Sequence, residues 1–428
     1  MTVKRAVSHE IFGYRIVSAA KSPVISITLF ALLIVFMFAD SIISNVSLQS
    51  AAFTEKEDSE VLQTPKVVRK IKSDVPSVPL KFSAERNTIN VDNEKPNSLV
   101  SFSGVREEQR IGRFGRKLPE YEIFRSDDLT KKFHGRVLEF SNQTCEVQFF
   151  MTWISTAGSF GRREILAVES VFKAHPHGCL MILSRTMDSV HGYRILKPLL
   201  DRGFKVLAVT PDFPFLLKNT PAEAWFDDMK SGKKDPGEIP LAQNLSNLMR
   251  LAVLYKYGGV YLDTDFIVLK SFKGLKNTIG AQSNDAVCKK WTRLNNAVLV
   301  FEMNHPLLFK FIQEFALTFD GNKWGHNGPY MVSRVVQRVE GRPGFNFTIL
   351  SPMAFYPVDW IKIGSLFKMP KDRTDSRWVE AKLHQLNGQT YGVHLWNKQS
   401  SKLMIKEGSV MGRLISEHCV LCRNIYSS

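Results

Sequence analysis

One segment, residues 241–272, constrains the fold more than any other part of this chain. It begins with apolar residues that recur at helical spacing. A pair of glycines at 258–259 then ends the helix, and the first of them is free to adopt a left-handed cap. A short apolar strand at 260–262 follows and delivers Asp263 and Asp265 at its carboxyl end. This order predicts an α/β unit with a polar site beyond the end of a buried strand.

Two carboxylates beside buried strands need compensation, because burial of a lone carboxylate is costly and two close together repel each other. A divalent cation provides that compensation. Alternation along an extended segment would point the side chains of Asp263 and Asp265 the same way. A metal held there can bridge the phosphates of a nucleotide sugar and act as a Lewis acid on the leaving diphosphate. A solvated turn or a salt-bridged pair is the alternative for an Asp-x-Asp triplet.

From Cys145 onward, strand and helix patterns alternate along the chain. The predicted strands are 146–154, 179–184 and 204–210, and the predicted helices between them are Arg162–Ala174 and 193–201. Such alternation requires right-handed crossovers and predicts a mostly parallel central sheet. Ligands of these sheets bind beyond the carboxyl ends of the strands.

The N-terminus has the pattern of a membrane anchor. Residues 23–39 contain no charge, and a membrane-spanning helix needs about 20 mostly apolar residues. Four basic residues precede the run, with only Glu10 opposing them, and such a flank stays cytoplasmic. We therefore expect a cytoplasmic tail at 1–21 and a transmembrane signal anchor at 22–43. A cleaved signal peptide is the alternative, and both place the rest of the chain in the secretory lumen.

The composition changes between residues 44 and 140, where prolines, serines and charges are frequent and apolar residues lack a sustained period. This pattern predicts a lumenal stem at 44–140 that holds a catalytic domain at 141–428 away from the membrane. An irregular extra domain remains open for 104–140.

Four N-glycosylation sequons agree with a lumenal location. We expect modification at Asn142 and Asn346. Asn45 lies close to the expected bilayer, and Asn244 falls within a predicted helix, where an oligosaccharide has no access.

The net charge of +16 favours phosphate-bearing partners. Nucleic acid is not expected among them, because the sequence has no zinc-finger spacing, RNA-binding aromatic signature or long basic block. The five cysteines include one Cys-x-x-Cys, at Cys419 and Cys422, without the second pair that a four-ligand zinc site needs. One or two structural disulfides are therefore expected.

The sequence resembles glycosyltransferase family 32, whose sugar-binding region carries an Asp-x-Asp motif. The resemblance rests on Leu245-Ser246-Asn247-Leu248-Met249-Arg250 and on Leu254-Tyr255-Lys256-Tyr257-Gly258-Gly259-Val260-Tyr261-Leu262-Asp263-Thr264-Asp265. Later segments resemble the lactosylceramide α-1,4-galactosyltransferase group, namely Leu294-Asn295-Asn296-Ala297, Trp324-Gly325-His326-Asn327-Gly328-Pro329 and Val393-His394-Leu395-Trp396-Asn397-Lys398.

The resemblance covers roughly residues 145–422. It places a sugar-binding region at about 180–300 and an α-1,4-galactosyltransferase-like region at about 301–428. It implies a GT-A (Rossmann-like) fold, a nucleotide-sugar donor, a divalent metal such as Mn²⁺, and retention of the anomeric configuration.

The resemblance also implies roles for individual residues around the donor. Asp263 and Asp265 match the catalytic metal and diphosphate positions. Arg250 and Tyr261 are expected near the donor, although a helix-surface arginine is the alternative for Arg250. Asn247 stands where the family motif usually has an aspartate that contacts the donor sugar, and an amide can still bond sugar hydroxyls.

Residues of the late polar segment are expected to close over the diphosphate. His394 would complete the metal shell as a neutral imidazole, with an interior, hydrogen-bonded histidine as the alternative. Trp396 would stack or donate its indole N–H, and Lys398 would neutralise phosphate. Asn327 and Gly328 are expected on the acceptor side, with a tight turn as the alternative.

These features predict a single-pass type II membrane glycosyltransferase with its catalytic domain in the Golgi lumen. We expect it to transfer a hexose, galactose from UDP-galactose, to a glycan or glycolipid acceptor, and to assemble as a homo- or hetero-oligomer. The acceptor hydroxyl would attack the face that the diphosphate leaves, through a stabilised oxocarbenium-like transition state. A non-catalytic sugar-binding or scaffold protein that keeps the fold is the alternative. A calcium-dependent adhesion module would need more clustered oxygen ligands.

Overall fold

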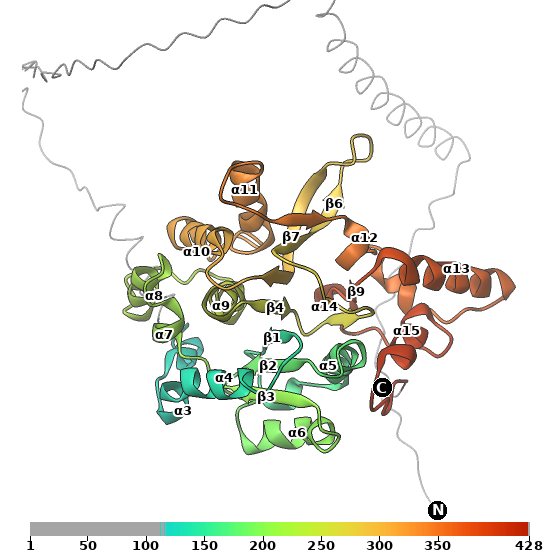
Figure 1. Cartoon of the computed structure of the whole chain (residues 1–428), viewed down its shortest axis with the longest axis horizontal. Helices are drawn as coiled ribbons and strands as arrows, with labels where there is room; N and C mark the ends of the chain where they lie inside the picture. The colour runs from blue at the N-terminus through green and yellow to red at the C-terminus, as the bar shows by residue number, and fades with distance from the viewer. Residues whose placement is uncertain (1–111, 113–114, 116, 427–428) are drawn as a thin grey trace, which may run out of the picture. The chain divides into compact units, whose positions relative to one another are not determined.

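The computed structural model describes residues 112, 115 and 117–426 (Figure 1). The expected cytoplasmic tail, the signal anchor at 22–43 and most of the stem lie outside these residues. Within the described part of the chain, no helix combines the length and the apolar character that a membrane crossing requires.

A seven-stranded sheet forms the centre of the molecule, in the order β3-β2-β1-β4-β7-β6-β8. Its strands are β1 Gln148–Thr152, β2 Cys179–Leu183, β3 Lys205–Val209, β4 Gly259–Leu262, β6 Thr278–Asn284, β7 Trp291–Phe301 and β8 Thr348–Leu350. Strands β3, β2, β1 and β4 are parallel, as are β6 and β8, whereas β7 is antiparallel to both of its neighbours. The expected α/β fold with a mostly parallel sheet is confirmed.

Helices cover both faces of this sheet (Figure 1). Alternate residues of β2 point to opposite sides, as a strand requires. Met181 joins one hydrophobic core and Leu180 the other. The first core contains α4 Phe133–Ser141, α7 Phe213–Leu217, α8 Ala222–Lys230, α9 Leu241–Tyr257, α10 Pro306–Thr318 and α11 Pro329–Val339. The second contains η2 Ala157–Ser159, α5 Arg162–Ala174, α6 Val190–Leu200 and α12 Pro352–Phe355.

The C-terminal part adds a third core and a small second sheet. Its elements are η3 Ile363–Phe367, α13 Arg373–Gln389, β9 Gly392–His394, α14 Asn397–Ser400 and α15 Val410–His418. Strand β5, Phe266–Val268, leaves the main sheet and pairs with β9, so that Phe266 lies opposite His394. This pairing places β9 beside the segment that follows Asp263 and Asp265.

The folded unit begins before residue 141, where the composition suggested the end of the stem. Residues 117–140 form η1 Leu118–Phe124, α3 Asp128–Lys131 and most of α4. Their apolar side chains, such as Phe124 and Phe133, are buried in the first core together with α9. The sequence pattern missed this segment because elements this short do not show a sustained period.

Two disulfides are present, as expected, between Cys145 and Cys179 and between Cys419 and Cys422. The first joins the segment before β1 to the start of β2. Cys288, the remaining cysteine, is free and exposed.

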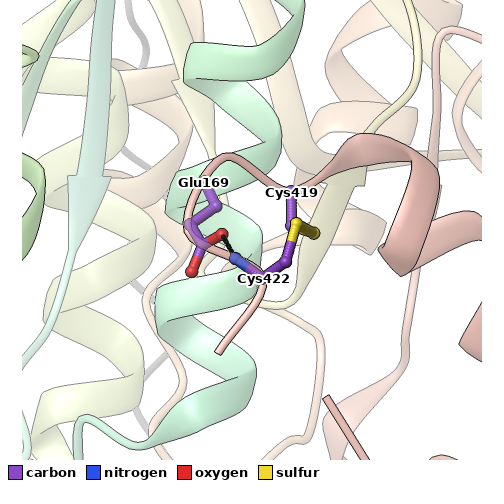
Figure 2. Close-up of side chains that lie close together, drawn as sticks. All are labelled: Glu169, Cys419 and Cys422. Carbon is purple, nitrogen blue, oxygen red and sulfur yellow. Dashed lines mark hydrogen bonds between the residues drawn. A yellow bond between two sulfur atoms is a disulfide. The ribbon is translucent and has the colours of Figure 1, made fainter. Parts of the chain in front are cut away.

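Glu169 of α5 fastens the C-terminal turn (Figure 2). Its Oε2 accepts hydrogen bonds from the backbone N–H groups of Val420 at 2.9 Å, Leu421 at 2.7 Å and Cys422 at 3.0 Å. The side chain is buried, so these three donors are the compensation for its burial.

We expect Glu169→Ala to destabilise the protein by about 3 kcal/mol, because three backbone N–H groups lose their shared acceptor. The free energy of unfolding in urea, measured with both disulfides intact, tests this. Glu139→Ala is the matched control, since Glu139 is exposed on α4. Equal unfolding midpoints for the two variants would contradict the role of Glu169.

Candidate active site

A cavity of about 760 Å³ lies beyond the carboxyl ends of β1 and β4. Thr152 and the residues after it contribute from β1, and the N-terminal half of α9 lines another side. The remaining walls are formed by β6 and β7, by the segment from Trp324 to Tyr330, and by Trp360 and 394–399. The position at the strand ends is the one expected from the alternating pattern.

The two glycines after α9 set the path of β4. A Cβ at Gly258 would lie 2.7 Å from the backbone N of Met303, and one at Gly259 would lie 2.6 Å from the carbonyl oxygen of Gln148. Both positions also have positive φ, 66° and 108°. The helix stop is therefore confirmed, but Gly258 has an extended ψ of −174° and not the predicted left-handed cap.

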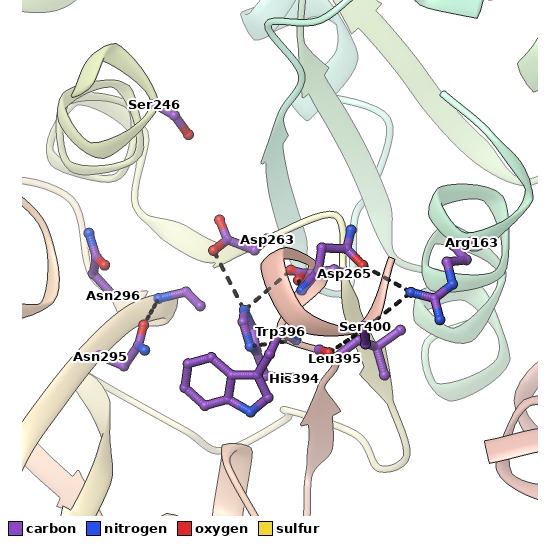
Figure 3. Close-up of polar contacts among 12 residues, drawn as sticks. Arg163, Ser246, Asp263, Asp265, Asn295, Asn296, His394, Leu395, Trp396 and Ser400 are labelled. Carbon is purple, nitrogen blue, oxygen red and sulfur yellow. Dashed lines mark hydrogen bonds and ion pairs between the residues drawn. The ribbon is translucent and has the colours of Figure 1, made fainter. Parts of the chain in front are cut away.

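Asp263 and Asp265 lie in a turn and not in the extended segment that was predicted. The N–H of Phe266 donates to the carbonyl oxygen of Asp263 at 3.2 Å and closes the turn. The two carboxylates still converge, because both reach the ring of His394 (Figure 3). His394 Nε2 lies 3.2 Å from Asp265 Oδ1 and 3.9 Å from Asp263 Oδ2.

The charges of this group depend on one another. Burial disfavours the charged form of His394, but the two carboxylates outweigh it and raise the pKa of the imidazole to about 9. Burial likewise opposes the ionisation of Asp265, yet His394 and the N–H of Asn397 lower the pKa of that carboxyl. The two carboxylates therefore favour the charged form of the His394 ring.

The same residues fit a divalent cation. Asp263, Asp265 and His394 each offer a ligand atom, and these atoms lie within 4.8 Å of one another. Carboxylate oxygens with an imidazole nitrogen form a donor set suited to Mn²⁺ and related ions.

Arg250 is a buried partner of Asp263 and not a helix-surface residue. Its Nη2 lies 3.0 Å from Asp263 Oδ1, and its Nη1 donates to the carbonyl oxygen of Asn296 at 2.7 Å. Burial opposes its charge, but Asp263 and Tyr261 hold the pKa of the guanidinium above its ordinary value. Arg250 also lines the cavity, as the resemblance implied.

Tyr261 does not line the cavity, which differs from its expected role in donor binding. Its side chain is fully buried beneath the site. The hydroxyl donates to Asp263 Oδ1 at 2.9 Å and lies 2.8 Å from Thr152 Oγ1, while Arg250 stacks on the ring. Tyr261 therefore orients Asp263 and Arg250 from below.

Asn247 lies at the cavity wall with its amide held in place. Its Nδ2 donates to the carbonyl oxygen of Gln243 at 3.2 Å, and its Oδ1 accepts from Nδ2 of Asn296 at 2.9 Å. Gly328 packs against it so closely that a Cβ there would lie 2.7 Å from Asn247 Oδ1. Sequence reasoning assigned no role to Asn296, although two asparagines inside an apolar strand are a usable signal.

Asn327 lines the cavity, and its side chain also fixes the turn that was the alternative to an acceptor contact. Its amide donates to Asn244 Oδ1 at 2.9 Å and to the carbonyl oxygen of Asp320 at 2.8 Å. Its Oδ1 accepts the N–H of Asp320 at 3.1 Å. These bonds fix the segment 320–328 and engage the polar atoms of Asn327.

The segment after β9 folds over the carboxylates. Trp396 has a left-handed φ of 54°, and this conformation lets the N–H of Asn397 donate to Asp265 Oδ2 at 2.8 Å. The indole N–H of Trp396 donates to the carbonyl oxygen of Val358, and the ring meets His394 edge-on at 4.4 Å. Lys398 Nζ lies 3.7 Å above the ring of Trp324.

Arg163 of α5 fixes the segment 397–403 through three hydrogen bonds (Figure 3). Its Nη1 donates to Asn397 Oδ1 at 3.3 Å and to Ser400 Oγ at 3.2 Å, and its Nη2 donates to the carbonyl oxygen of Leu403 at 3.1 Å. Sequence reasoning missed Arg163 because its partners lie more than two hundred residues away in the sequence.

We expect Arg163→Gln to weaken Mn²⁺ binding roughly tenfold, as loss of outer-sphere support does at other metal sites. The variant loses the fork that positions Asn397 against Asp265. Electron paramagnetic resonance titration of free Mn²⁺ measures this affinity. Arg162→Gln, one residue earlier on α5, is the control, and equal affinities of the two variants would contradict the positioning role.

Comparisons with known proteins identify the family. Residues 161–286 match the glycosyltransferase sugar-binding region containing the DXD motif, and residues 300–426 match the alpha 1,4-glycosyltransferase conserved region. Mouse lactosylceramide 4-alpha-galactosyltransferase is 33% identical over 267 residues, which cover 59% of this chain and 68% of that protein.

Two further relatives show how far the similarity extends. Human alpha-1,4-N-acetylglucosaminyltransferase is 24% identical over 220 residues, which cover 49% of this chain and 58% of that protein. An uncharacterized Arabidopsis thaliana protein is 30% identical over 295 residues, covering 67% of this chain but 44% of the longer relative. The chain therefore belongs to the family of hexosyltransferases that combine a DXD sugar-binding region with the alpha 1,4-glycosyltransferase conserved region.

Proposed function

We propose that this chain is a retaining, metal-dependent hexosyltransferase with a GT-A fold. It transfers galactose from UDP-galactose to a glycan or glycolipid acceptor. The observation that carries the proposal is the convergence of Asp263, Asp265 and His394 in a cavity beyond the strand ends. The name of the mouse relative supports galactose, whereas that of the human relative keeps N-acetylglucosamine as a second donor sugar to test.

Asp263, Asp265 and His394 hold the divalent cation in this proposal, with Mn²⁺ as its identity. When bound, the metal would bind the donor diphosphate and stabilise its charge as it leaves. Arg250 fixes the rotamer of Asp263, and Lys398 at the cavity mouth supplies a further positive charge for the phosphates. Asn247 and Asn296 offer amide groups to the donor sugar.

The cavity supports attack on the face that the diphosphate leaves. Among the described residues that line it, the carboxylates are Asp263 and Asp265. Both are engaged by Arg250, His394 and the N–H of Asn397. No lining carboxylate is therefore available as a covalent nucleophile, and the acceptor hydroxyl itself attacks the anomeric carbon.

We place the enzyme in the Golgi membrane as a single-pass type II protein, with the folded unit from residue 117 onward as the lumenal catalytic domain. The uncharged run within 22–43 and its basic flank support this topology. Asn142 and Asn346 are exposed and so suit glycosylation, whereas Asn244 is buried in α9. Assembly with itself or with other Golgi proteins stays a prediction.

The test is a donor screen with the full chain in detergent. UDP-galactose, UDP-glucose, UDP-N-acetylglucosamine and GDP-mannose are each incubated with Mn²⁺ or with chelator, with and without lactosides. We expect Mn²⁺-dependent release of UDP from UDP-galactose. If no donor is hydrolysed or transferred, and none shifts the melting temperature, the non-catalytic scaffold is the better account.

A further inference from the structure

Two aromatic rings at the cavity mouth each carry a cation. Lys398 of α14 lies over Trp324, and Arg293 of β7 lies over Tyr330 with its Cζ 4.8 Å from the ring centroid. All four residues line the cavity. The two cations thus approach the segment 324–330 from different elements. Because a cation–π contact does not use up the N–H donors, these groups can still bond a ligand.

Arg293 differs from the other arginines of this region in its lack of an acidic partner. Arg250 is paired with Asp263, while Arg334 and Arg338 share Glu314. In the described part of the chain, Arg293 forms no ion pair and no side-chain hydrogen bond, although it is half-buried. A guanidinium held in a cavity without a carboxylate is a ready site for an anion.

The sum of the charges in the cavity also indicates that Arg293 binds an anion. This argument rests on the proposed function. The ionisable residues that line the cavity are Arg250, Asp263, Asp265, Arg293, His394 and Lys398. With a divalent cation on a neutral His394, Arg250 and Lys398 balance the carboxylates and the donor diphosphate. The charge of Arg293 is then left without a counterpart, so the remaining substrate should provide one.

The position of Arg293 assigns that charge to the acceptor. Asp263 donates its N–H to the carbonyl oxygen of Ala297 on β7, and Arg293 precedes Ala297 by four residues on the same strand. The pairing of β7 with β6 shifts its register between these two positions. Arg293 contacts Tyr330, whereas the carboxylates contact Arg250, His394 and the N–H of Asn397, so the two groups belong to different parts of the cavity.

We propose that Arg293 and Tyr330 form an acceptor subsite for an acidic sugar, with a uronic acid carboxylate on the guanidinium. The carboxylate would accept two parallel hydrogen bonds from the guanidinium fork. The ring of Tyr330, which is 42% exposed, keeps Arg293 in place and offers apolar surface to the sugar ring.

The test compares matched acceptors that differ only at C6, methyl galactoside against methyl galacturonoside and methyl glucoside against methyl glucuronoside. The full chain is assayed with Mn²⁺ and its donor, as wild type, Arg293→Gln and Arg293→Lys. Arg342→Gln is the control, because Arg342 is exposed outside the cavity. We expect the wild type to favour the acidic member by roughly 10- to 100-fold in kcat/KM, the range of a hydrogen-bonded charge pair.

Arg293→Gln should abolish this preference, Arg293→Lys should keep part of it as a point charge, and the control should keep it in full. Donor hydrolysis and donor KM should stay unchanged in Arg293→Gln, so that loss of the subsite differs from failure of the proposed function. An equal effect of Arg293→Gln on both members of a pair would overturn the proposal. A raised donor KM in Arg293→Gln would mean that Arg293 binds the donor and not the acceptor, and this result would also overturn the proposal.

A binding measurement covers the case in which none of these glycosides is glycosylated. Saturation-transfer NMR compares methyl glucuronoside with methyl glucoside on the wild type and on Arg293→Gln. We expect a stronger signal for the glucuronoside that the substitution removes. Equal signals from the two sugars on the wild type would refute the subsite.

Discussion

Asp265→Asn is expected to lower kcat/KM by roughly 1000-fold or more, because it removes a ligand from the metal on which the leaving diphosphate depends. Asp265 is almost fully buried, with Oδ1 on His394 and Oδ2 on the N–H of Asn397. An amide cannot replace both contacts, since its nitrogen would face either the proposed cation or the N–H of Asn397, and neither accepts a hydrogen bond. The loss should therefore include metal affinity as well as turnover.

The measurement is kcat/KM for galactose transfer, with kcat taken at saturating donor, together with Mn²⁺ affinity by paramagnetic resonance. Asp201→Asn is the matched control, because Asp201 is an exposed carboxylate at the end of α6 that pairs with Lys197. Full turnover by Asp265→Asn would contradict the assignment of Asp265 as a metal ligand, irrespective of the result for Asp201→Asn.

Arg250→Met is the second large effect, and here the expected loss is in stability. We expect a decrease of about 3 to 5 kcal/mol in the free energy of unfolding, because the substitution leaves Asp263 without its buried cation. The carbonyl oxygens of Ser246 and Asn296 also lose the donor that Arg250 supplies. Urea denaturation of the full chain in detergent, followed by tryptophan fluorescence, gives the value.

A double-mutant cycle separates the ion pair from the lost packing of Arg250. Asp263→Asn removes the charge that Arg250 compensates, so the double variant should be less destabilised than the two single variants together. We expect a coupling of about 1 to 3 kcal/mol. Strict additivity of the two substitutions would mean that the pair contributes nothing measurable.

The sequence predicted those parts of the fold that depend on local periodicity. Helix α5 has the predicted bounds, and β1, β2 and β3 lie within the predicted strands. The stop at Gly258 was also predictable, since it needs only the glycine pair and the apolar pattern on either side. Short elements such as η1 were missed, because η1 is fixed by packing against α9 and not by a period of its own.

The residues proposed as metal ligands were predictable from the sequence, but the residues that position them were not. Asp263, Asp265 and His394 carry a motif and a family resemblance, and the structure brings them together. The roles of Arg163 and Arg293 depend on contacts between segments distant in sequence, which no local pattern records. The β5–β9 pairing is of the same kind, because it joins strands separated by most of the C-terminal half.

Tyr261 and Asn327 show why a motif position does not fix a role. Both were predicted as site residues, Tyr261 for the donor and Asn327 for the acceptor, but their polar atoms are already bonded inside the protein. Tyr261 holds Asp263, and Asn327 holds the segment 320–328. Neighbourhood in the sequence predicted proximity to the site, whereas the direction of each side chain required the packed structure.

The most direct test of the central claim is a paramagnetic resonance titration of the full chain with Mn²⁺, in the presence and absence of UDP. The account predicts a single saturable Mn²⁺ site that binds more tightly with UDP and is lost in Asp265→Asn. Mn²⁺ binding that is the same in Asp265→Asn, or UDP binding that is equally tight in chelator, would contradict the assignment of Asp263, Asp265 and His394 as the metal and diphosphate site.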